Sequence, residues 1–163
     1  MTAQTGETGV TAEPTDAAVV VGIGQLAAGD DGVGLAVARV LAARGVETRE
    51  SADASVLLSL LEAGRRVVLV DAVAGAGAPG SVLQLDVGAL ASGPTPLSSH
   101  GIGVAEALEL ARTLYGAQSV ARVEIVGVAI TRPGGVSSFG LSPAVAAAVE
   151  PAAALAASLA GER

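Results

Sequence analysis

Residues 18–34, AVVVGIGQLAAGDDGVG, decide the fold class of this chain. A continuous apolar run leads into a glycine-rich turn, and from Val33 onward the apolar residues recur at helical spacing. An apolar run without alternation is typical of a strand buried on both faces, as in a parallel sheet covered by helices. The stretch therefore predicts a strand, a turn and a helix of an α/β protein. The turn also carries two adjacent carboxylates, Asp30 and Asp31, where a glycine-rich turn would ordinarily receive a phosphate.

Strands and helices are expected to alternate through most of the 163 residues, which predicts a largely parallel sheet in an α/β/α sandwich. The expected strands are 17–23, 46–50, 66–72, 82–87 and 122–130. The expected helices are 33–44, 54–64, 101–115 and 141–160. For the last helix we expect Ser142 as N-cap, Pro143 as first residue and a kink at Pro151. The strand 82–87 follows its predecessor after a short turn, so we expect it to run antiparallel at an edge.

Composition excludes several classes of function. The chain has no cysteine, which rules out disulfides, zinc fingers, iron–sulfur clusters and thiol catalysis. Its net charge of -7 and the lack of a basic cluster argue against a nucleic-acid surface. No basic residue precedes Arg39 and no apolar run reaches the roughly 18 residues of a membrane span, so we expect a cytoplasmic protein. Residues 1–15 are polar and aperiodic, and are expected to form a disordered arm before a single domain, 16–163.

The glycine turn fits the dinucleotide-binding pattern G-x-G-x-x-G/A at residues 22–27. Glu47 and Glu50 stand near the end of the next expected strand, where such a site has its ribose-binding acid. However, a second glycine-flanked turn delays the helix to about Val33, and two carboxylates would then face the phosphates without a cation. Electrostatic repulsion between these carboxylates and the phosphates disfavours a nucleotide-binding module.

An acidic turn at the mouth of a parallel sheet suits a cation better. Asp31 follows the first strand, Asp71 ends the strand RVVLV, and His100 immediately precedes a helix. The carboxyl ends of parallel strands share one edge, where ligands bind, so these three side chains can converge. Two carboxylates and one imidazole form an open site for a divalent transition metal.

Each of these residues also has a purely structural interpretation. Asp30 or Asp31 can cap the helix that starts near Val33. Asp71 can accept hydrogen bonds from the following turn, and His100, the only histidine, can be structural. Ser99 beside His100 would allow a hydrolase dyad, but the G-x-S-x-G elbow is absent.

Four blocks of the chain resemble, in order and spacing, the motifs of the hydrogenase maturation endopeptidases. The blocks are GIGQLAAGDDGVG, VVLVDAVAGAGAPG, SSHGIGVAEALEL and VEIVGVAI…GLSPAVAAAVEPA, and the resemblance runs from about residue 17 to residue 160. It implies a three-layer α/β/α domain with a mixed five-stranded sheet. It also implies an enzyme that trims the C-terminus of the large-subunit precursor of a nickel–iron hydrogenase after nickel insertion.

The same resemblance implies the site. Asp31, rather than Asp30, matches the family's acid in the glycine turn, and Asp71 and His100 match its other two metal-engaging residues. Nickel would be supplied by the substrate, and no organic cofactor is expected. Whether metal-bound water or a carboxylate base hydrolyses the peptide stays open. A non-catalytic, metal-dependent maturation checkpoint with the same three ligands is the alternative from another class.

Two further residues are candidates for substrate binding. Gln25 occupies the position where the family usually has Asn, which keeps the amide but shifts any hydrogen bond that it makes. Arg132 lies in the glycine-rich segment 131–140, which is expected to leave the sheet at the same edge as Asp71. Phe139, the only phenylalanine, lies in the same segment and either lines a groove or packs on the last helix.

Overall fold

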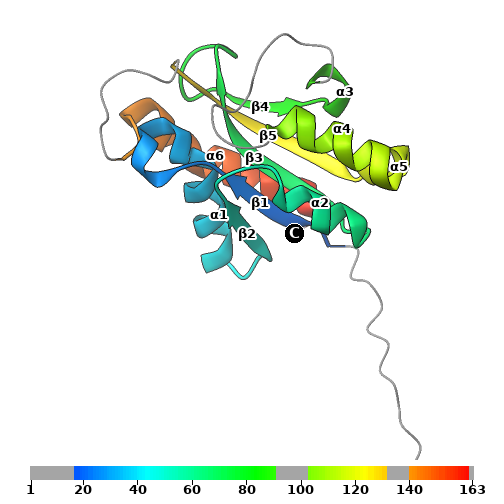
Figure 1. The fold of residues 1–163 in the computed structure, drawn as a ribbon. Coiled ribbons are helices and arrows are strands. Elements are labelled where there is room, and N and C mark those ends of the chain that lie inside the picture. Colours follow the sequence, from blue (N-terminus) through cyan, green and yellow to red (C-terminus); the bar gives the residue numbers. More distant parts are fainter. Residues whose placement is uncertain (1–16, 91–102, 132–139, 162–163) are drawn as a thin grey trace, which may run out of the picture.

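The computed structural model describes residues 17–90, 103–131 and 140–161, and its centre is a five-stranded sheet (Figure 1). The strands are β1 (Val19–Ile23), β2 (Thr48–Ser51), β3 (Val67–Ala74), β4 (Val82–Leu85) and β5 (Val123–Ile130). Their order is β2-β1-β3-β5-β4. All pairs are parallel except β4 with β5, so the short strand is antiparallel at an edge, as predicted. The predicted arm, 1–15, lies outside the described residues.

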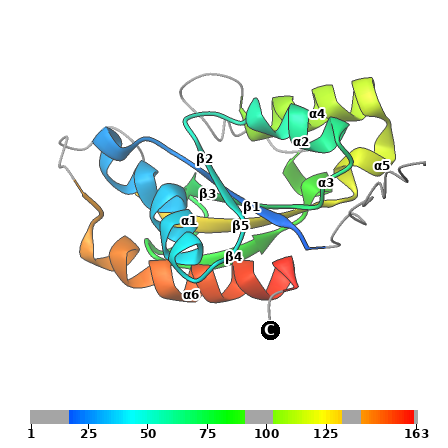
Figure 2. The same ribbon diagram turned by 90° about the horizontal axis from the view of Figure 1, so that it is seen from below.

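Helices cover both faces of this sheet, which confirms the three-layer architecture. One face carries α1 (Val33–Ala43) and α6 (Pro143–Ala160), and the other carries α2 (Val56–Glu62) and α4 (Val104–Tyr115) (Figure 2). The structure adds three short elements that the hydrophobic pattern did not predict. These are the 3-10 segment η1 (Leu26–Gly32) and the single-turn helices α3 (Val87–Leu90) and α5 (Ala117–Val120).

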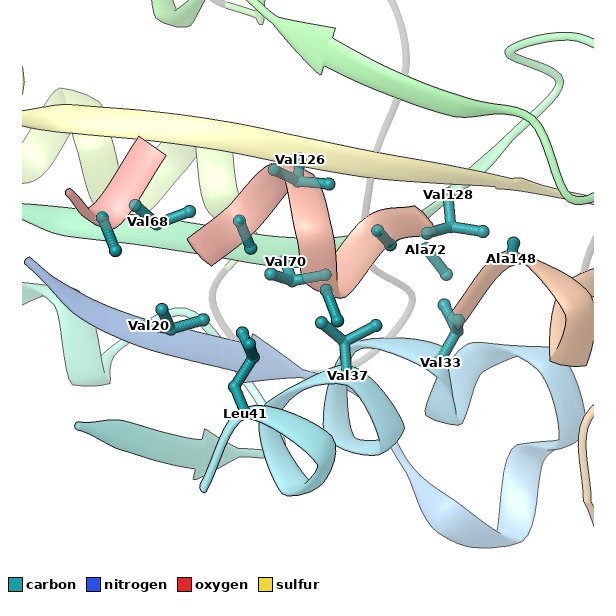
Figure 3. Packing of buried hydrophobic residues seen from close by; sticks show 14 of the residues in the cluster. Val20, Val33, Val37, Leu41, Val68, Val70, Ala72, Val126, Val128 and Ala148 are labelled. Carbon is teal, nitrogen blue, oxygen red and sulfur yellow. The ribbon is translucent and has the colours of Figure 1, made fainter. Parts of the chain in front are cut away.

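Small aliphatic side chains build the core on each face. Alternate residues of the strands, among them Val20, Val70 and Val126, point toward α1 and α6, where Val37 is fully buried (Figure 3). The residues between them, such as Leu69, form a second buried cluster with α2 and α4. The buried face of α6 is mainly alanine: Ala148, Ala152, Ala153, Ala156 and Ala160. Side chains this small let the helix lie close to the sheet, so a tight core forms without large aromatic residues.

The helix ends confirm several predictions from the sequence. After α1, Gly45 has a φ of 85°, and Val46 N–H donates to the Leu41 carbonyl at 3.1 Å. That six-to-one bond is the mark of a Schellman ending, in which glycine avoids the Cβ strain of a left-handed residue. Helix α6 has Ser142 as N-cap and Pro143 as its first residue, and it continues through Pro151 to Ala160.

By length and composition alone, α6 could cross a membrane, because its 18 residues have a mean hydropathy of 1.5. No such segment was expected from the sequence, because the chain has no unbroken apolar run of that length. A core helix passes the same test, and α6 packs its alanine face on α1 and the sheet. Only 33% of the helix is buried, so packing in the core accounts for this one face of α6.

Candidate active site

The sheet has a topological switch point between β1 and β3. From β1 the chain crosses to β2 on one side, and it then returns to β3 on the other side. The two connections that leave the carboxyl ends of β1 and β3 therefore diverge, and a crevice forms at that point in open α/β sheets. The glycine turn with Asp31 follows β1, and Asp71 belongs to β3. The fold thus places both predicted carboxylates at the switch point.

Glycines at two positions allow the turn to fold tightly over the end of β1. A Cβ atom on Gly34 would collide with the carbonyl oxygens of Ile23 and Val70, so the first turn of α1 lies directly on the backbone of β1 and β3. A Cβ atom on Gly24 would collide with the carbonyl oxygen of Asp31. The chain's own backbone thus fills the space beside these glycines, where a dinucleotide site would bring its pyrophosphate close to the backbone.

Asp31 is held within the turn rather than at the helix. Its Oδ2 accepts a hydrogen bond from Gln25 N–H at 3.1 Å, and the residue is only partly buried. The N-cap of α1 is Gly32, without a side-chain cap bond. The capping role considered for Asp31 is therefore wrong, because its carboxylate bonds backward to the start of the turn. This leaves Oδ1 without a hydrogen-bond partner among the described residues.

Asp30 does not cap α1 either. Its Oδ1 accepts from Ser142 N–H at 2.6 Å and its Oδ2 from Ser142 Oγ–H at 2.9 Å. The contact joins the glycine turn to Ser142, the N-cap residue of α6, which lies 112 positions further along the chain. Asp30 is thus a structural aspartate, as the sequence favoured, but it serves a different helix. The sequence marked Ser142 only as an N-cap and could not indicate its partner.

Asp71 lies within β3 and not at its end, which corrects the sequence prediction. The strand continues to Ala74 because it pairs with β5 up to Ile130, whereas its last pair with β1 is Val70 with Gly22. Asp71 is therefore the first residue of β3 after the last β1–β3 pair. Its neighbours Val70 and Ala72 face α1 and α6, so its own side chain faces α2 and α4.

Burial dominates the electrostatics of Asp71. The residue is 6% exposed, and its Oδ1 accepts a hydrogen bond from Ala72 N–H at 2.8 Å. Burial raises the pKa of the Asp71 carboxyl to about 8; the Ala72 bond opposes the rise, and the negative charge of Asp31 adds to it. The influence of Asp31 on this pKa shows that the two carboxylates are electrostatic neighbours. Free of a cation, Asp71 holds a proton near neutral pH.

The remaining predicted site residues lie outside the described part of the chain. These residues are His100, Arg132 and Phe139. Helix α4 begins at Val104, four residues after His100, and covers the face of the sheet toward which Asp71 points. Within residues 17–90, 103–131 and 140–161, no three acidic or histidine side chains form a metal-binding group. The structure therefore brings two of the three predicted ligands together, and the third remains a prediction.

The acids expected for a ribose in the nucleotide alternative are engaged elsewhere. Glu47 pairs with Arg65 at 2.6 Å, and Glu50 pairs with Arg39 at 2.8 Å. An open apolar hollow of about 480 Å³ between α4 and α5 contains neither Asp31 nor Asp71. These ion pairs give the nucleotide alternative no support.

Comparisons with known proteins agree with this fold. The family model "Hydrogenase maturation protease" matches residues 52–159, a segment that includes Asp71 and His100. The match spans well over half of the chain, so this protein belongs to the hydrogenase maturation protease family and is a peptidase. No curated protein sequence matches the chain.

Solved structures show the same fold. The maturation protease HybD from Thermococcus kodakarensis is 24% identical with a TM-score of 0.69, over 88% of this chain and 99% of its own. The endopeptidase HybD from E. coli is 23% identical with a TM-score of 0.67, over 90% and 93%. HycI from T. kodakarensis is 22% identical with a TM-score of 0.66, again over 90% and 93%. At such identities, the likeness establishes the α/β architecture.

Proposed function

We propose that this protein removes the C-terminal peptide from the large-subunit precursor of a nickel–iron hydrogenase, after nickel has been inserted into that precursor. The observation that carries the proposal is the buried Asp71 beside the partly exposed Asp31 at the switch point of a maturation-protease fold. We place the reaction in the cytoplasm, with neither nucleic acid nor a membrane as partner.

The donor atoms suit a metal that arrives with the substrate. Asp31 and Asp71 supply carboxylate oxygens, and His100 would supply an imidazole nitrogen; such a mixed set with open positions can hold a divalent transition metal. Metal binding requires ionised carboxylates, whereas burial favours the protonated form of Asp71. Binding of nickel-loaded precursor is therefore expected to release a proton from Asp71.

Hydrolysis needs a water molecule that is activated next to the scissile bond. Asp31 is accessible and keeps Oδ1 without a partner among the described residues, so it can contact nickel or accept a proton from water. A general base works best when its pKa lies near the working pH, which Asp71 satisfies in the free enzyme. Both routes, metal-activated water and a carboxylate base, use the same pair.

Substrate contacts are proposed for two residues. Gln25 precedes η1 and donates its backbone N–H to Asp31, so its side chain starts beside the site. Arg132 follows β5 by two residues and would reach a carboxylate of the precursor.

Mass measurement of a candidate large subunit tests the function. Incubation with this protein is expected to remove a C-terminal peptide from nickel-loaded precursor and to leave nickel-free precursor intact. Asp31→Asn should stop the cleavage, and Asp86→Asn, at an exposed turn remote from the pair, should not. Binding of nickel-loaded precursor without loss of mass would instead favour the non-catalytic checkpoint.

A further inference from the structure

Asp30 joins two segments that are far apart in the sequence. Both of its carboxylate oxygens are used by Ser142, one by the backbone N–H and one by the hydroxyl group. Ser142 is the N-cap of α6 but makes no side-chain cap bond to its own helix. Its hydroxyl is directed to Asp30 instead. We call this pair of hydrogen bonds the Asp30–Ser142 clasp.

The clasp is favourable for a negative charge. The residue after Ser142 is Pro143, which has no N–H group, so the Ser142 N–H is the donor that the helix start presents there. A carboxylate near a helix N-terminus gains from the helix dipole, and hydrogen bonds to a charged acceptor are stronger than neutral ones. The contact therefore gives the glycine turn a firm anchor outside its own loop.

The turn needs such an anchor. Its 3-10 segment is interrupted at Ala28 and Gly29, where φ is -108° and 61°. Before the interruption, Leu26 is 55% exposed, so packing does little to hold that part. After the interruption come Asp30 and Asp31. The clasp is the interaction that ties this second part to the rest of the protein immediately before Asp31.

We propose that Asp30 is a positioning residue: through the Asp30–Ser142 clasp it fixes the turn so that the Asp31 carboxylate faces Asp71. The clasp holds the turn just before Asp31, and the Gln25–Asp31 hydrogen bond of 3.1 Å holds the Asp31 side chain itself. Loss of the clasp frees the turn to pivot at Gly29, which weakens the Gln25–Asp31 bond. The effect on processing rests on the proposed function, whereas the effect on that bond does not.

Three variants separate positioning from other roles. Asp30→Ala removes both hydrogen bonds. Asp30→Asn keeps an acceptor for Ser142 N–H and a polar contact to its hydroxyl, and Ser142→Ala removes only one bond. Residues that orient a ligand-bearing side chain typically contribute about 10–100-fold. We expect Asp30→Ala to lower the processing rate at saturating nickel-loaded precursor by this factor, Asp30→Asn to restore most of it, and Ser142→Ala to fall between them.

Amide hydrogen exchange at Gln25 provides a readout without substrate. Its N–H is the donor to Asp31, so exchange should accelerate in Asp30→Ala and stay near the wild-type rate in Asp30→Asn. Asp86→Ala is the matched control, because it removes another aspartate–backbone bond, from Gly88 N–H at 2.6 Å. Asp86 directly follows Leu85, the last residue of β4. Leu85 pairs with Ile125, which lies five residues before the end of β5. The control should change neither readout.

The proposal is overturned if folded Asp30→Ala, assayed well below its melting temperature, processes normally with unchanged exchange at Gln25. It is also overturned if Asp30→Asn is as inactive as Asp30→Ala while Gln25 stays protected, since Asp30 would then contact metal or substrate itself. If Asp30→Ala does not fold, Ser142→Ala decides by the same two measurements. If wild-type protein cleaves no precursor, the proposed function fails, and the exchange result alone decides the role of the clasp.

Discussion

Asp71 is an ionisable residue buried away from water, and its burial makes the stability of the fold depend on pH. Burial raises its pKa in the folded protein from 3.8 to about 8, so the folded state holds a proton that the unfolded state releases. The unfavourable contribution of Asp71 is therefore absent below about pH 4, grows as the pH rises through this interval, and is complete above about pH 8. Its size is on the order of a few kcal/mol.

Asp71→Asn should remove this pH dependence. The melting temperature of the variant is expected to exceed that of wild type by several degrees at pH 8.5, and the difference should shrink steadily toward pH 4. Circular dichroism melts across this range measure it, with Asp86→Asn as an exposed control. A difference between variant and wild type that is equal at all pH values would show that Asp71 is not protonated in the fold.

The three predicted ligands should each be essential for processing but not for folding. Asp31→Ala, Asp71→Ala and His100→Ala are expected to abolish removal of the C-terminal peptide, because each removes one donor atom from an open metal site. None of them should lower the melting temperature by more than a few degrees, and loss of the buried acid at Asp71 should help at neutral pH. Precursor mass and thermal melts give both quantities. Near-normal processing by one variant would remove that residue from the site.

At the level of residues, the sequence predicted where Asp31 and Asp71 lie but not the contacts that surround them. Chain direction alone placed Asp31 and Asp71 at one edge of the sheet, and in the structure the charge of Asp31 contributes to the raised pKa of Asp71. The role of Asp30 could not be predicted, since its partner Ser142 is 112 residues away. Contacts of that separation depend on how helices pack, and local patterns do not encode it.

Among the elements, the start of α1 requires a glycine at position 34 more strictly than the sequence motif indicates. A side chain at Gly34 would meet backbone oxygen atoms of two strands, which cannot move aside. Gly34→Ala is therefore expected to cost about 3 kcal/mol of unfolding free energy, at the upper end of typical overpacking. Gly45→Ala faces open space and strains only its φ of 85°, so it should cost about 1 kcal/mol. Chemical denaturation compares them, and an equal or smaller loss for Gly34→Ala would contradict the close approach.

Element boundaries show where sequence patterns stop being informative. The delay of α1 to Val33 was predicted, because a glycine-flanked turn interrupts the helical spacing before it. The length of β3 was not predicted, since an aspartate normally marks the end of a strand, whereas pairing with β5 carries β3 on to Ala74. The helices α3 and α5 have four residues each, which is too short for a periodic signal.

At the scale of the whole molecule, the strand order explains why a small number of side chains is enough to form the candidate site. The switch between β1 and β3 creates the crevice, and the close packing of the glycine turn supplies its acidic wall. An open site with only three protein ligands should bind free nickel weakly. We therefore expect that treating the enzyme alone with a chelator, followed by removal of the chelator, leaves its processing rate unchanged. Cleavage of nickel-free precursor by the same preparation would mean a conventional hydrolase instead.

The segment between β5 and α6 is attached at both ends near the candidate site. Because β5 is parallel to β3 and Ile130 pairs with Ala74, the chain leaves the sheet at the edge that holds Asp71, as the sequence predicted. It is fixed again at Ser142 by Asp30. Both attachment points of residues 131–142 thus lie near the candidate site, and we expect the segment between them to contact the precursor.

Replacing residues 133–138 by two glycines keeps both attachment points and shortens the segment between them. We expect the KM for nickel-loaded precursor to rise about tenfold or more while kcat changes little, the signature of lost substrate binding. The melting temperature should fall by no more than a few degrees, since loop length alone has a small entropic effect. Arg132→Ala should reproduce part of the KM effect if Arg132 binds a carboxylate of the precursor. A shortened protein that melts much earlier yet processes normally when folded would make the segment structural and place the substrate groove elsewhere.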